Sequence, residues 1–257
     1  MAEAAAEHKS EFPDHNRSKW PVVMLVLRTL FFLASQALFA AILAASGAPN
    51  PWKASAAWWP ISATLTNLVS LGLLLFLARR EGIRWSRVVH ADFRREHVRN
   101  DLLLLLGLLV LSGPIAMIPN IGLAKLLYGD AEIAIGLFIQ PLPAWAAAAS
   151  LILFPLSQAV GELPTYFGYA MPRLTIRWGN PRIAMVVCAM WLGMQHVTLP
   201  LIPDVRFILW RLGMFIPFAL LLAWAFQIRP RLLPYFMGVH AIIDFPVALM
   251  VWQASVR

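Results

Sequence analysis

The sequence predicts an all-α, polytopic transmembrane helix bundle with about seven spans. Of its 257 residues, 60% are hydrophobic and only 13% are charged, a balance that is not typical of soluble domains. Several apolar runs approach or exceed the roughly 20 residues that a helix needs to cross a bilayer. Lys and Arg lie mainly between these runs, so the net charge of +8 reflects membrane topology and does not indicate nucleic-acid binding.

The predicted spans are separated by connections of different character. They are placed at residues 21–45, 56–78, 102–117, 144–171, 183–200, 207–226 and 232–252. A polar tail at 1–20 precedes the first span. The stretch 121–143 is broken by charges and prolines, so we expect a connection on the outer face, with a re-entrant path or an eighth crossing as alternatives.

A basic segment at 79–101 holds seven arginines and is too charged to enter hydrocarbon. Ile83, Trp85, Val88 and Val89 within it could form the apolar face of a helix that lies on anionic headgroups. A solvated basic loop is the alternative.

The distribution of Lys and Arg predicts the orientation. With a cytoplasmic N-terminus, most basic residues fall in inner segments, which include the tail, the basic segment and the loops after the fourth and sixth spans. The outer segments hold Lys53, Lys125, Arg206 and Arg257. We therefore expect seven spans with the N-terminus inside.

Four titratable side chains from three spans fall at similar depth. Counted at about 1.5 Å per residue from the nearest inner arginine, Glu162 lies about 16 Å deep and His196 about 21 Å. His240 and Asp244 lie about 13 and 20 Å deep, and their spacing of four residues puts them on one helix face. A carboxylate in hydrocarbon costs about 2.5–3.5 kcal/mol on insertion scales, so such groups need partners inside the bundle. We predict that these four residues form a buried site.

These groups suit several kinds of chemistry. A carboxylate and a histidine can activate water while a second histidine and an acid stabilise an oxyanion. The same set can bind zinc or iron, although the His-Glu-x-x-His pattern of zinc peptidases is absent from the sequence. Such groups could also form a proton or cation relay in a transporter, or a polar network that only fixes helix register.

At these residues the sequence resembles the CPBP family of intramembrane endopeptidases, which includes CAAX prenyl proteases and bacteriocin-processing enzymes. The family pattern is Glu-Glu-x-x-x-Arg on one helix, Phe-x-x-x-His on a second and His-x-x-x-Asn/Asp on a third. The corresponding residues here are Glu162, Leu163 and Phe167, then Leu192 and His196, and then His240 and Asp244, with the first motif aligned through Gly168-Tyr169 and Pro172-Arg173-Leu174. The resemblance covers roughly 144–251. It implies a catalytic core at 144–252 that follows N-terminal spans at 21–143.

The resemblance implies hydrolysis of a peptide bond within a bacterial inner membrane, without a cofactor or an obligate metal. The substrate would be a membrane-associated peptide or protein, such as a prenylated peptide, a bacteriocin leader or a membrane-protein loop. Glu162 and His196 would activate the water, and His240 and Asp244 would stabilise the oxyanion. An unprotonated Asp cannot donate a hydrogen bond, so Asp244 would act either protonated or by orienting His240.

Two positions depart from the family pattern, because Leu163 and Phe167 stand where the second glutamate and the arginine belong. Losing both members of an ion pair together is less damaging than losing one, which would leave a buried charge unpaired. The main alternative is therefore a catalytically inactive relative that acts as a membrane partner or immunity-type protein. An ion-coupled transporter is the third possibility.

Three further residues within the spans bear on the interpretation. Arg28 and Arg211 are charged residues in apolar runs. Arg211 either faces Glu162 or Asp244 in place of the missing arginine, or snorkels to the outer interface. Cys188 is expected to be a small core residue, because a single cysteine cannot form an intramolecular disulfide.

Overall fold

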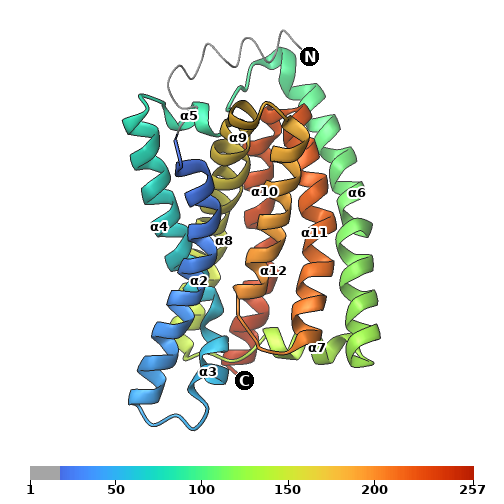
Figure 1. Ribbon diagram of the computed structural model, residues 1–257. Helices are drawn as coiled ribbons and strands as arrows, with labels where there is room; N and C mark the ends of the chain where they lie inside the picture. Colours follow the sequence, from blue (N-terminus) through green and yellow to red (C-terminus); the bar gives the residue numbers. More distant parts are fainter. Residues whose placement is uncertain (1–17) are drawn as a thin grey trace.

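The protein is all-helical in the computed structural model, which describes residues 18–257 (Figure 1). Within those residues, six helices are long and apolar enough to cross a membrane, so the chain is a multi-pass membrane protein as predicted. They are α2 (Trp20–Ala45), α4 (Trp59–Arg80) preceded by α3 (Pro51–Ser55), α6 (Arg95–Tyr128), α8 (Ala144–Leu163) continued by the π-helical segment η3 (Pro164–Ala170) and by α9 (Met171–Trp178), α11 (Val205–Ile228), and α12 (Leu233–Ser255). Of the predicted tail at 1–20, residues 1–17 lie outside the described part of the chain.

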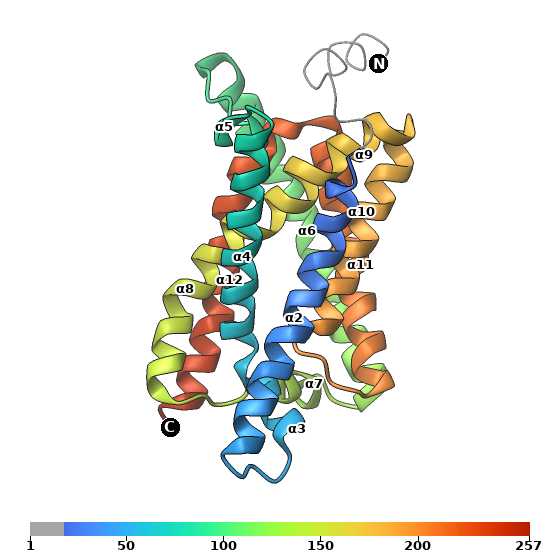
Figure 2. The same ribbon diagram turned by 60° about the vertical axis from the view of Figure 1, so that its left-hand side comes forward.

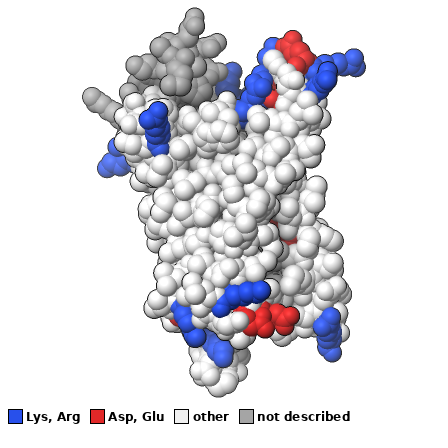
Figure 3. All heavy atoms as spheres, turned by 90° about the vertical axis from the view of Figure 1, so that its right-hand side faces the viewer, with Lys and Arg blue, Asp and Glu red and all other residues white. Residues whose placement is uncertain are grey.

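The exposed charges on one face of the protein lie at the two ends of the bundle. On the face seen in Figure 3, Lys, Arg, Asp and Glu gather at both ends, and the surface between them is almost free of charge. The start of α2, the short helix α5 (Trp85–Val88) and α9 share one end, while the C-terminus lies at the other (Figure 1). The arginine-rich segment therefore sits at the same end as the start of α2.

The predicted span at 183–200 is not a full-length helix. Helix α10 (Pro181–Gln195) has 15 residues and a length of about 22 Å, which is short of a hydrocarbon core about 30 Å thick. It is followed by the 3-10 turn η4 (His196–Thr198) and by an extended stretch that continues to the start of α11 (Figure 2). Pro200 explains why helical structure stops after η4, because proline lacks a backbone donor and disfavours helical geometry in the preceding residue, Leu199.

Helix α6 is longer than the predicted span at 102–117. It begins at Arg95 and continues through Pro114 and Pro119 to Tyr128. The rest of the predicted connection holds α7 (Ala131–Phe138), eight residues at the end of the bundle opposite α5 (Figure 1). A helix of about 12 Å cannot cross the bilayer, so the eighth crossing considered from the sequence is wrong.

The apolar side chains of the basic segment face the protein, not the membrane surface. Helix α5 is a single turn, and Ile83, Val88 and Val89 are all buried. Ile83 and Val88 pack in one cluster with side chains of α2, α4 and η3. The prediction of a helix lying on headgroups is therefore wrong, because these side chains are needed to cover the end of the bundle.

Beyond α5, Asp92 receives bidentate hydrogen bonds from the guanidinium of the exposed Arg94. These bonds lower the pKa of Asp92 to about 2, so its carboxylate stays charged at physiological pH.

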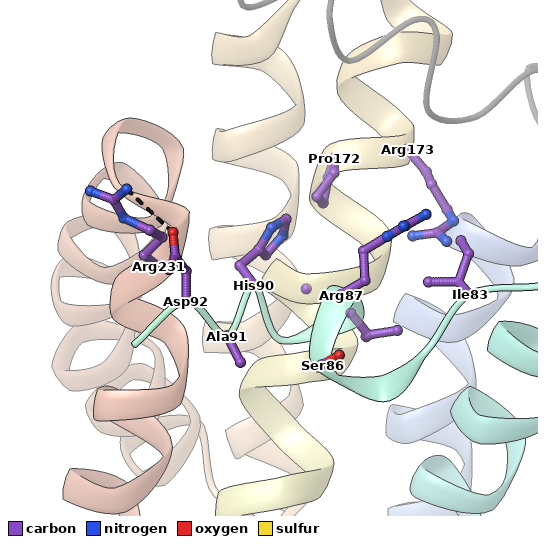
Figure 4. A pocket seen from close by; sticks show the side chains of 11 residues that line it. Ile83, Ser86, Arg87, His90, Ala91, Asp92, Pro172, Arg173 and Arg231 are labelled. Atoms are coloured by element: carbon purple, nitrogen blue, oxygen red, sulfur yellow. Dashed lines mark ion pairs between the residues drawn. The ribbon is translucent and has the colours of Figure 1, made fainter. Parts of the chain in front are cut away.

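A cavity of about 370 Å³ at this end is lined by Arg87, Arg173 and Arg231 together with His90 and Asp92 (Figure 4). In Figure 4, Arg231 and Asp92 form an ion pair on one side, His90 lies between, and Arg87 and Arg173 lie on the other. The Arg231–Asp92 separation is 3.7 Å, and Arg173 pairs with Glu81. Most of the positive charge here is thus already balanced by acids of the same chain.

The main helix contacts form two groups that α2 joins. Helix α8 packs against α12 and α4, whereas α11 packs against α10 and α6. Helix α2 contacts α4, η3 and α10 and so bridges the two groups (Figure 2). A Cβ added to Gly161 of α8 would lie 3.0 Å from the Cβ of Asn67, which shows how closely α4 and α8 approach. The candidate site lies between the two groups.

Candidate functional site

Glu162 is held at the end of α8 by an irregular part of its helix. The Glu162 side chain is 3% exposed. Pro164 follows two residues later and cannot donate a backbone hydrogen bond, and the chain continues through the seven-residue π-helical segment η3. Such wide turns occur inside long helices and are frequent at functional sites. Thr165 Oγ1 donates to the Gly161 carbonyl at 2.7 Å, which satisfies one backbone acceptor in this region.

The four residues predicted from membrane depth lie together in the structure. Glu162 Oε1 is 3.7 Å from His196 Nε2, and Glu162 Oε2 is 3.4 Å from His240 Nε2. His240 Nε2 is also 3.3 Å from Asp244 Oδ2. Three helical elements, α8, η4 and α12, therefore bring two acids and two imidazoles together inside the helix bundle.

His196 is fixed with a defined side of its ring toward Glu162. Its Nδ1 lies 2.7 Å from the carbonyl oxygen of Leu192. A carbonyl only accepts, so Nδ1 carries the hydrogen and Nε2 of the neutral ring is an acceptor. The ring also stacks on Phe215, with centroids 3.7 Å apart and planes inclined by 16°. Nε2 is therefore aimed at Glu162 with its lone pair available.

His240 and Asp244 form the more open side of the site. Their side chains are 14% and 17% exposed, against 3% for Glu162. His240 Nδ1 and Asp244 Oδ2 have no hydrogen-bond partner within residues 18–257. Nε2 of His240 lies 3.4 Å from Glu162 Oε2 and 3.3 Å from Asp244 Oδ2, so this nitrogen is placed between the two carboxyl groups.

A cavity of about 460 Å³ runs past all four residues. It is bounded by α6, α7, α8, α11 and α12, and its walls are mostly aliphatic and aromatic. Along α12 the lining residues follow one helix face, namely Phe236, Val239, His240, Ile243, Asp244, Val247 and Met250. Ile243 and Met117 line the cavity and are also about half exposed, so it opens to the lipid-facing surface between α12 and α6. The four titratable groups thus face an apolar space that lipid-embedded chains can reach.

Arg211 takes neither of the two positions predicted for it. It is buried, with 3% exposure, so it does not snorkel to the interface. It also does not face an acid, because Nε donates to the His196 carbonyl at 3.0 Å and Nη2 to the Leu199 carbonyl at 2.9 Å. The α-helix ends at Gln195, so these carbonyls lack α-helical partners, although the His196 carbonyl also accepts from the Leu199 backbone N–H at 3.4 Å. The guanidinium therefore binds the carbonyls that follow the end of α10.

Sequence reasoning missed three polar residues that contact the site from other helices. Arg28 of α2 has Nη2 3.9 Å from Glu162 Oε1. Gln195 donates a hydrogen bond from Nε2 to the same oxygen. Asn67 of α4 accepts a 2.9 Å bond from Arg28. The only sequence signal was the charge of Arg28 inside an apolar span, since Asn and Gln carry no comparable warning.

Cys188 is buried as predicted. Among the residues described, no group of three or more His, Cys, Asp or Glu side chains has the arrangement to hold a metal ion.

Taken together, the fold and the site define a multi-pass membrane protein with a buried acid–imidazole cluster open to an apolar cavity.

Comparisons with protein-family models, with curated proteins and with solved structures found no match to this chain.

Proposed function

We propose that the protein is an intramembrane endopeptidase that hydrolyses a peptide bond of a membrane-associated peptide or protein. The observation that carries the proposal is the 3.7 Å separation of Glu162 Oε1 and His196 Nε2 at the cavity wall. Both atoms are acceptors, and the separation is less than twice the usual hydrogen-bond length of about 2.8 Å, so one water molecule can donate to both.

In the proposed reaction, this water loses a proton to Glu162 or His196 as its oxygen attacks the scissile carbonyl carbon. Negative charge develops on the carbonyl oxygen, and this oxygen accepts a hydrogen bond from His240 Nε2. Collapse of the tetrahedral intermediate breaks the C–N bond, and the proton taken from the water passes to the leaving amine. Asp244 Oδ2 lies 3.3 Å from His240 Nε2, and in this proposal the protonated carboxyl group donates a second hydrogen bond to the carbonyl oxygen.

The motif resemblance supports the same reaction. The order Glu162, His196, His240 and Asp244 matches the CPBP pattern, and these residues meet at one cavity. Leu163 and Phe167, at the positions of the missing glutamate and arginine, are both buried, and the Phe167 ring lies 5.1 Å from that of Phe226. The apolar pair is therefore accommodated without leaving an unpaired charge.

The proposed location is a bacterial inner membrane, with the N-terminus and the arginine-rich end in the cytoplasm. The concentration of arginines around α5 and α9 supports this orientation. We propose seven crossings, with α10 and the extended stretch after it forming the fifth. The substrate then approaches from the lipid through the opening between α12 and α6.

Purified protein in nanodiscs, incubated with libraries of apolar peptides, tests the proposal. Wild type is expected to cleave a subset of peptides, and Glu162→Gln to lower kcat/KM by at least about 100-fold, because general-base groups contribute about 10²–10⁴-fold. Glu132→Gln, on the exposed end helix α7, is the matched control and should cleave normally. Equal cleavage by wild type and Glu162→Gln would refute the role of Glu162. An inactive membrane partner would instead keep its cellular phenotype in Glu162→Gln, and a transporter would show substrate-dependent ion flux in liposomes.

A further inference from the structure

Arg28 brings a positive charge to Glu162 from the far side of the site. The residue is 1% exposed and lies in the first membrane-spanning helix. Besides its approach to Glu162, Nη2 donates to Asn67 Oδ1 at 2.9 Å and Nε donates to Gln195 Oε1 at 3.1 Å. A buried guanidinium is costly unless it is paired and hydrogen-bonded, so these contacts explain why it is tolerated in the span.

Arg28 also decides which way the amide of Gln195 points. Gln195 Oε1 accepts from Arg28 Nε and, at 2.7 Å, from the hydroxyl of Tyr166. Two donors on one side fix that atom as the oxygen, so the NH₂ group must face the other way. That group donates to Glu162 Oε1. The guanidinium thus acts on the carboxylate both directly and through the Gln195 amide.

Asn67 is oriented by the same rule. Its Oδ1 accepts from Arg28, so its Nδ2 is the donor and bonds Gln158 Oε1 at 2.6 Å and Ser157 Oγ at 3.2 Å. Gln158 and Ser157 lie on α8, one turn before Glu162. The network therefore ties α2 and α4 to the helix turn that carries the carboxylate.

The result is a carboxylate with two different oxygens. Oε1 accepts from Gln195, lies near Arg28 and is the oxygen nearest to His196 Nε2, whereas Oε2 lies nearest to His240. The hydrogen bond from Gln195 leaves Oε1 a second lone pair for the water shared with His196. Without these bonds, rotation of the carboxyl group would exchange the two oxygens.

We propose that Arg28, acting with Gln195, is the positioning residue of Glu162 and balances its charge from α2. The inference rests on the proposed function, because it assigns the role to the same hydrolytic site. It also accounts for Phe167, which stands where the family pattern has an arginine. Here the positive charge beside the acid comes from Arg28 on a different helix. Arg28 does not line the cavity and is not expected to touch the substrate.

A thermodynamic cycle tests the charge pairing without any need for activity. Melting temperatures in detergent are measured for wild type, Arg28→Met, Glu162→Gln and the double variant. Arg28→Met leaves a buried carboxylate without its cation and should lower Tm by about 10 °C in wild type, but by less than half of that in the Glu162→Gln background. Gln36→Met is the control, because Gln36 is buried on the same helix and bonds only the backbone of Leu201. Its effect should be the same in both backgrounds.

If Arg28→Met alone does not fold, recovery of folded protein in the double variant shows the same coupling. Equal losses in the two backgrounds, or equal failure to fold, would overturn the proposal.

The kinetic arm separates positioning from a general structural role. Arg28→Met is expected to lower kcat by about 100-fold with KM changed by less than about 3-fold, because the carboxylate is misplaced while the cavity is intact. Arg28→Lys restores a charge and should recover at least about a tenth of wild-type kcat. If wild type cleaves and Arg28→Met has the same kcat, the positioning role is refuted and the proposed function stands. Absence of cleavage in wild type refutes the function, and the Tm cycle still reports on the pairing.

Discussion

A methyl group added at Gly168 should be strongly destabilising, although the change is small. Gly168 lies in η3, and a Cβ built there would be 2.4 Å from the carbonyl oxygen of Val88. Ordinary contact begins near 3.4 Å, so η3 and the α5 segment must separate by about 1 Å. The obstacle is backbone, which cannot rotate away as a flexible side chain can.

Overpacking of this kind costs about 1–3 kcal/mol. For a chain of this size, that corresponds to a fall in Tm of about 2–12 °C, at 2–4 °C per kcal/mol. Val88 and its neighbours are buried against η3, so the loss of fit should also loosen the basic segment.

The assay is thermal unfolding of purified Gly168→Ala in detergent, followed by size-exclusion chromatography. Gly107→Ala is the matched control, because Gly107 lies in α6 and an added Cβ would meet nothing within 4 Å. There the higher helix propensity of alanine should leave Tm unchanged or raise it slightly. If Gly168→Ala melts with wild type, or if the two variants fall equally, the close packing of α5 on η3 is not as described.

Two further predictions concern the site and the orientation. Phe215→Leu removes the ring that stacks on His196, an interaction worth about 0.5–1.5 kcal/mol. We expect kcat to fall by up to about 10-fold while the protein stays folded. A kcat equal to that of wild type would show that the stacking does not position the imidazole. For orientation, Cys188→Ala gives a cysteine-free background, in which a membrane-impermeant maleimide added to intact cells should label Lys53→Cys but not Ser86→Cys. The reverse pattern would place the arginine-rich end outside.

The sequence was most informative where the bilayer imposes a simple constraint. In lipid, the backbone N–H and C=O groups must form hydrogen bonds within the protein, which favours helices. Hydropathy therefore predicted an all-helical membrane protein and located its long apolar helices. The cost of burying charge then selected Glu162, His196, His240 and Asp244 by depth alone, and the structure brings these four together. The predictions were least accurate about helix length: α10 ends at Gln195, within the span predicted at 183–200, and α6 extends beyond the span predicted at 102–117 at both ends.

The tertiary structure alone decided which helices face each other. Lipid-facing and protein-facing surfaces are both apolar in a membrane, so the pattern of apolar residues does not indicate which faces pack together. For that reason nothing in the sequence linked Arg28 to Gln195, 167 residues away, or turned Ile83 and Val88 inward. The sequence by itself determined that acids and imidazoles lie at one depth inside a membrane bundle. Packing determined that an arginine and an amide from other helices hold one of those acids in place, because only contact between helices can select among groups at equal depth.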